Sequence, residues 1–251
     1  ELIAMSIQEL REWTDEEKEK IQHLTETINN TIRREQFKLP LPKEIMLVKS
    51  TLNDEGGAGG YTPSNWIALT DRLFTHLPTD FHQKLLLHET FHVLTRNSLA
   101  FKRKMYETIG FTVTDEELDY PKDLWDIHIS NPDVGRYDSY ATFIVEGKPV
   151  KCAMVLYADR PYTTGSFFQY MNIGFVPYNE QMKPEQENGK TIVYPMEKIS
   201  DFKKKIGENT QYIIHPEEIL AENFVLAFTD QQSVPTPDLK EKGRKILKSN
   251  L

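Results

Sequence analysis

Residues 88–92 are His-Glu-Thr-Phe-His, the HExxH pattern, and they lie within an apolar run. Residues four apart share one face of a helix, so the imidazoles of His88 and His92 would project together. Two neutral imidazoles at this spacing can occupy two corners of a Zn²⁺ tetrahedron. Glu89 is offset by about 100° around the helix axis, so it would take a proton from a zinc-bound water rather than bind the metal.

A catalytic zinc keeps three protein ligands and one open position, and a second segment, 216–228, offers the third ligand. Pro216 suits the first turn of a helix, where no N–H is needed, and the apolar residues that follow extend that helix. Glu218 and Glu222 are four apart and share a face. One of them can bind the metal while the other accepts a hydrogen bond from a ligand histidine, which fixes its tautomer.

These two segments resemble the gluzincin metallopeptidases, in which a glutamate from a later helix completes the HExxH site. In that family the ligand glutamate is followed, four residues on, by an acid that is usually Asp. Residues 218–222 are Glu-Ile-Leu-Ala-Glu, so the resemblance implies Glu218 as the third zinc ligand and Glu222 as the partner of a ligand histidine. Glu217 is the alternative ligand, although no acid lies four residues after it. The third histidine of the metzincin motif is absent from 93–98.

The resemblance implies an α+β fold with a zincin-like core, made of a small sheet with an edge strand, the HExxH helix and the helix that carries Glu218. The aromatic-rich segment 111–195 between the two helices has strand-like patterns, which predict a β-rich insertion that flanks or roofs the cleft. We expect residues 1–251 to form a single metallopeptidase domain, in which 231–251 is a polar C-terminal tail with a short helix.

Helical periods and caps predict helices at 15–36, 79–96, 99–109, 199–206 and 216–228. Alternating or β-branched runs predict strands at 44–50, 66–69, 140–145, 150–157, 167–175 and 191–194. Thr79 or Asp80 is expected to cap the HExxH helix. The Gly-rich loop 53–60 and the segment 61–70 are expected to provide the edge strand on which an extended substrate pairs. An ordinary Gly-rich hairpin is the alternative.

Composition narrows the class of protein. With 251 residues, 39% of them hydrophobic, the chain can bury a sizeable core. The formal net charge of −8 disfavours nucleic acid as the main partner, and no apolar stretch is long enough to predict a membrane span. Cys152 is the only cysteine, which excludes an internal disulfide. The chain opens on Glu1, so we expect a leader to have been removed or the chain to have been trimmed, and a secreted or periplasmic location is favoured.

The sequence therefore predicts a zinc-dependent metallopeptidase that hydrolyses peptide bonds with a zinc-bound water and Glu89 as general base. Its substrate would be a peptide or a protein. A catalytically inactive zincin-fold protein that binds a peptide is the alternative, and a helix that matches HExxH by coincidence is a third. The retained Glu89 argues against the second hypothesis, and the Glu218 helix argues against the third.

Substrate details are less well defined by the sequence, which specifies no oligomeric state. The absence of a visible acidic motif for an amino terminus favours an endopeptidase. Asn131-Pro132-Asp133 lacks the spacing of a calcium loop and predicts a turn. An oxyanion donor is expected among the polar aromatic residues of the insertion, without a choice between them: His128, Tyr137, Tyr140, Tyr157, Tyr162 and Tyr170.

Overall fold

A computed structural model describes residues 2–250 and places the chain in the α+β class. The α-helices are α1 (Leu2–Glu9), α2 (Asp15–Glu35), α3 (Leu73–His76), α4 (Thr79–Asn97), α5 (Leu99–Thr108), α6 (Lys122–Trp125), α7 (Phe202–Ile206), α8 (Pro216–Phe228) and α9 (Pro237–Leu247). Short 3₁₀ helices are η1 (Asn53–Glu55), η2 (Phe167–Tyr170) and η3 (Met196–Lys198). The strands are β1 (Leu10–Arg11), β2 (Met46–Ser50), β3 (Gly60–Tyr61), β4 (Trp66–Thr70), β5 (Phe111–Val113), β6 (Ser139–Val145), β7 (Lys148–Ala158), β8 (Met171–Pro177), β9 (Gln186–Glu187), β10 (Lys190–Thr191) and β11 (Tyr194–Pro195).

The first sheet has the order β1-β2-β4-β3, with β2 and β4 parallel and β3 antiparallel to β4. The run Ile67-Ala68-Leu69 is buried in β4, as expected for a strand with neighbours on both sides. The prediction that 61–70 as a whole supplies the edge strand is therefore wrong for β4. The edge strand beside β4 is β3, which is two residues long and begins at Gly60, the last residue of the glycine loop.

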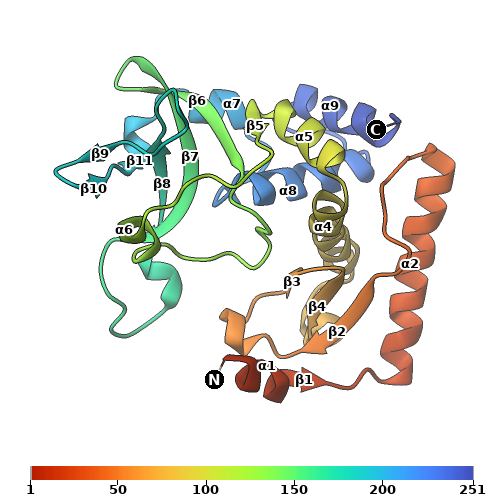
Figure 1. Ribbon diagram of the computed structural model, residues 1–251. Coiled ribbons are helices and arrows are strands. Elements are labelled where there is room, and N and C mark those ends of the chain that lie inside the picture. The colour runs from red at the N-terminus through yellow and green to blue at the C-terminus, as the bar shows by residue number, and fades with distance from the viewer. Residues whose placement is uncertain (1, 251) are drawn as a thin grey trace.

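The segment between α5 and α7 contributes a second sheet, with the order β11-β8-β7-β6-β5. In Figure 1 this sheet stands on one side of α4 and α8, and α2 and the small sheet lie on the other sides. Glu146 and Gly147 both have positive φ, 48° and 83°, which is the backbone of a tight two-residue hairpin between β6 and β7. The predicted strand 167–175 differs: its first part is the 3₁₀ helix η2, and β8 begins at Met171.

The two helices that carry the predicted ligands begin differently. α8 begins as expected, with Pro216 in its first turn, and the side chain of His215 accepts a hydrogen bond from the Glu217 N–H. α4 is capped by neither Thr79 nor Asp80, because the extended residue Pro78 occupies the N-cap position. Tertiary packing compensates for the missing polar cap, since most of α4 is buried against α8 and the small sheet.

The C-terminal segment is more closely packed than a polar tail. α9 lies against α8 with Leu239 and Leu247 buried. Gly243 permits the close approach, because a Cβ there would come within 3.3 Å of the Ala227 Cβ. Within residues 2–250, no helix combines the length and apolarity needed to cross a membrane.

Candidate metal centre

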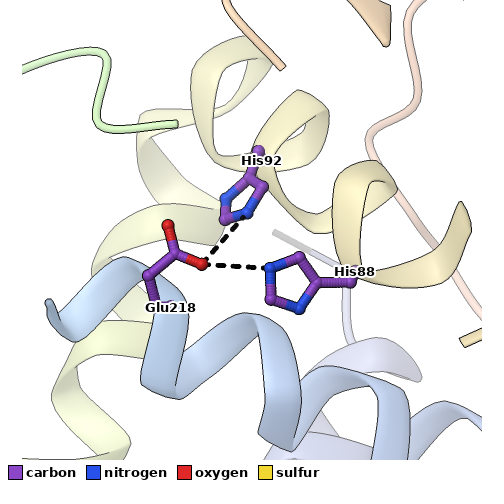
Figure 2. A group of neighbouring side chains, drawn as sticks. All are labelled: His88, His92 and Glu218. Atoms are coloured by element: carbon purple, nitrogen blue, oxygen red, sulfur yellow. Dashed lines mark hydrogen bonds and ion pairs between the residues drawn. The ribbon is translucent and has the colours of Figure 1, made fainter. Parts of the chain in front are cut away.

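Three side chains from α4 and α8 converge on one point, as Figure 2 shows. The Nε2 atoms of His88 and His92 lie 3.0 and 3.7 Å from the same Glu218 oxygen, Oε2. Two ligands about 2.0–2.1 Å from a tetrahedral zinc ion lie about 3.3 Å from each other. The observed separations bracket this value, so the three atoms can hold one small metal ion.

The Nε2 atom of His92 gives the clearest sign that something belongs between these side chains. The His92 side chain is fully buried, and within the described residues its Nε2 has no hydrogen-bond partner. A buried polar atom without a partner is rare, because it loses its hydration without replacement. A metal ion bound by Nε2 would remove this penalty.

In each of the two histidines, the second ring nitrogen, Nδ1, forms a hydrogen bond with a carboxylate of α8. Nδ1 of His88 donates to Glu222 Oε1 at 2.9 Å, and Nδ1 of His92 donates to Glu217 Oε1 at 3.2 Å. Such partners fix the tautomer and direct Nε2 toward a metal. Glu222 therefore lies where the second role was predicted, whereas Glu217, the alternative ligand, lies on the opposite side of His92 from the shared point.

Glu217 belongs to a buried polar cluster rather than to the cleft. Its carboxylate also accepts hydrogen bonds from the hydroxyls of Thr95 and Tyr106. Burial alone would raise the pKa of Glu217, but the hydrogen bond and charge of His92, the charge of Lys102 and the hydrogen bond from Thr95 hold that pKa below its usual value. The carboxylate is therefore charged, and it fixes the ring of His92.

The insertion orients Glu218. Asn131 Nδ2 donates to Glu218 Oε1 at 2.7 Å, which leaves Oε2 to face the two histidines. Asn131 belongs to a turn closed by the hydrogen bond from the Val134 N–H to the Asn131 carbonyl, at 3.0 Å. The turn predicted at 131–133 is confirmed, and it places a side chain on the candidate ligand.

Charge at the site is concentrated. Burial alone would raise the pKa of Glu218, but the neighbouring imidazoles of His92 and His88 lower it to about 2. Burial alone would lower the pKa of His92, but the carboxylates of Asp133, Glu218 and Glu217 raise it to about 9. In the metal-free chain Glu218 is thus an anion at neutral pH, and a metal ion must displace a proton from His92.

Glu89 lies beside the three candidate ligands and is not one of them. Its side chain is 2% exposed, and the Thr62 hydroxyl donates to its Oε2 at 2.7 Å. Burial, together with the charge of Asp133, raises the pKa of Glu89 to about 7. A group with a pKa near neutrality can both accept and return a proton, as a general base and acid must.

Gly60 sets how closely the edge strand approaches Glu89. A Cβ at position 60 would lie 2.8 Å from Glu89 Oε1 and 3.0 Å from the Ala68 carbonyl oxygen. We therefore expect Gly60→Ala to displace Glu89. For the peptide hydrolysis that the sequence predicts, this should lower kcat up to about 100-fold, since misplacement by about 1 Å can cost that much. Steady-state kinetics on the metal-loaded variant test this. Gly59→Ala is the control, because a Cβ there meets nothing nearer than the Leu85 side chain, at an ordinary contact distance of 3.5 Å. Equal kcat in Gly60→Ala and the wild type would contradict the role of Gly60.

Two of the three candidate ligands, His88 and Glu218, line a cleft of about 1270 Å³. Of the six oxyanion donors named from the sequence, His128 lines this cleft, and the five tyrosines are not among its described lining residues. Tyr212, which was not predicted, does line it, and its ring lies 6.2 Å from the ring of His88. Its only signal in the sequence is its position shortly before α8.

No protein-family model matches this chain, and no curated protein or solved structure matches it either.

Proposed function

We propose that the chain is a zinc-dependent metallopeptidase with a zincin-like core of the gluzincin type. The observation that carries the proposal is the convergence of His88, His92 and Glu218 around the unpartnered Nε2 of His92, with Glu89 beside them. Two imidazoles and one carboxylate are a donor set typical of catalytic zinc, in which the fourth position stays open. Here that position would face the cleft, which His88, Glu89 and Glu218 all line.

When bound, zinc would lower the pKa of water toward about 7 and polarise a carbonyl group. Glu89 accepts the proton of the attacking water at a carboxylate oxygen and returns it to the leaving amine. Thr62 holds this carboxylate through its hydroxyl group. Tyr212 keeps its proton at neutral pH, because partial burial and the nearby carboxylate of Glu218 raise its pKa. Its hydroxyl is our candidate donor to the oxyanion.

Two features support a peptide as the substrate. The cleft is larger than the roughly 300–1,000 Å³ of ordinary small-molecule pockets. The edge strand β3 also borders the cleft beside α4, and Gly60 and Tyr61 of β3 line it. An exposed strand edge can pair with an extended peptide through backbone hydrogen bonds.

Metal removal tests the proposal. The purified chain is treated with a chelator, reloaded with Zn²⁺ and assayed for bound metal and for cleavage of a peptide library. We expect one zinc per chain, no cleavage after chelation and recovery on reloading. Zinc binding without any cleavage would support the alternative of an inactive peptide-binding protein. A chain that binds no zinc would contradict both functions.

A further inference from the structure

Asp133 is a buried carboxylate in the lining of the cleft, and the proposed mechanism does not use it. It is 9% exposed, it lines the cleft, and one of its oxygens lies within 4.8 Å of a Glu89 oxygen and a His92 nitrogen. Its Oδ1 accepts a hydrogen bond from the Thr62 N–H at 2.6 Å. Among the described residues, no lysine or arginine forms an ion pair with it. Its imidazole neighbour, His92, would be neutral once it binds a metal. A buried charge without a counter-ion is costly unless a ligand supplies one.

The turn that contains Asp133, described above at residues 131–134, closes one end of the edge strand β3. The Gly59 carbonyl accepts from the Thr70 N–H, so that pair is hydrogen-bonded across β3 and β4. Hydrogen bonding alternates along an antiparallel pair, so Gly60 and Thr62 direct their backbone groups away from β4. At Thr62 both groups are already taken: Asp133 accepts from its N–H, and the Arg96 guanidinium donates to its carbonyl.

A substrate strand can therefore pair with Gly60 and must stop at Thr62. Arg96 also donates to the Pro132 carbonyl at 2.8 Å, which fastens the turn to α4. The closed end presents the Asp133 carboxylate to the cleft. A peptide that ends here would meet a negative charge, which attracts a terminal amine and repels a terminal carboxylate.

The charge of the whole cleft is consistent with a cationic substrate end. Lys84 is the only lysine or arginine among its described lining residues, and Asp80 lies 3.7 Å from it. The carboxylates that line the cleft are those of Asp54, Glu55, Glu89, Asp133, Glu218 and Glu222. A cleft with this excess of negative charge raises the local concentration of cations.

Building on the proposed peptidase function, we propose that Asp133 binds the free α-amine of the substrate, so that the enzyme removes the first residue of a peptide. An α-nitrogen lies about 2.5 Å from the carbonyl carbon of its own residue. An amine held by Asp133 therefore places the first peptide bond beside Glu89 and His92. Hydrolysis of that bond consumes one water and releases one free amino acid. The sequence favoured an endopeptidase because it shows no acidic motif for an amino terminus. Asp133 belongs to no such motif, so the proposed aminopeptidase specificity differs from that expectation.

The test compares two peptides of the same sequence, one with a free amino terminus and one acetylated, on the zinc-loaded chain. We expect acetylation to lower kcat/KM roughly 10- to 100-fold, the value of a hydrogen bond to a charged group. Mass spectrometry should show release of the first residue. Asp133→Asn keeps an oxygen for the Thr62 N–H but removes the charge. It should raise KM for the free peptide and bring the ratio of the two kcat/KM values close to one.

Asp126→Asn, an exposed change in the same insertion, is the matched control and should keep the wild-type ratio. Equal cleavage of both peptides by the wild type would overturn the role of Asp133 and leave the peptidase function intact. An unchanged ratio in Asp133→Asn would also overturn it. A zinc-loaded chain that cleaves neither peptide would overturn the peptidase function, and this inference with it.

Discussion

Replacing Glu89 by Gln is expected to lower kcat for peptide hydrolysis roughly 10²- to 10⁴-fold, the usual contribution of a general base. The amide has nearly the same size, and its oxygen can still accept the hydrogen bond from the Thr62 hydroxyl. It cannot accept a proton from water at neutral pH. Because Glu89 is not one of the three converging ligands, bound zinc should stay at one ion per chain.

Metal content and kcat should be measured on the same preparation of Glu89→Gln. Glu107→Gln, an exposed change on α5, is the matched control and should retain wild-type kcat. Peptide cleavage at the wild-type rate in Glu89→Gln would show that another group accepts the proton. A variant that loses its zinc would show that Glu89 is itself a ligand.

Replacing His92 by Ala is expected to weaken zinc binding more than 100-fold, because the loss of an outer partner alone costs roughly 10–100-fold. The change removes Nε2, the nitrogen that would bind the metal. It also removes the Nδ1 hydrogen bond to the charged Glu217. The wild type should gain thermal stability on addition of zinc, since a ligand that binds only the folded state stabilises it. The variant should gain none.

Affinity is best measured by competition with a coloured chelator, together with thermal unfolding with and without Zn²⁺. His82→Ala provides the control within the same helix. The ring of His82 bonds the Leu77 carbonyl at 3.0 Å and lies outside the candidate site. If His92→Ala bound zinc as tightly as His82→Ala does, the assignment of His92 as a ligand would be wrong.

The candidate-site residues on α4 and α8 could be predicted from the sequence, because the geometry of a helix depends only on local spacing. Spacing by four residues places His88 above His92 and Glu218 above Glu222, whatever surrounds the helices. The orientation of the histidine rings could be predicted in part, because Glu222 accepts a hydrogen bond from His88, as expected for an acid four residues after Glu218. That these residues bind zinc stays a prediction.

The rest of the candidate site comes from loops, whose contacts depend on the tertiary fold. The tripeptide at 131–133 predicts a turn, but nothing in it shows that Asn131 reaches Glu218 or that Asp133 reaches Thr62. Thr62 follows β3, a two-residue strand that is too short to show an alternating pattern in the sequence, so its role was not predicted. Glu217 was weighed only as a ligand, because its contact with Tyr106 joins residues distant in the chain.

The candidate ligands come from α4 and α8, and the whole insertion with its five-stranded sheet separates these helices in the chain. During synthesis, His88 and His92 emerge from the ribosome long before Glu218 does. The proposed hydrolase would therefore stay inert until α8 has been made and folded. Nascent segments of the same chain would thereby be spared from cleavage by the proposed activity.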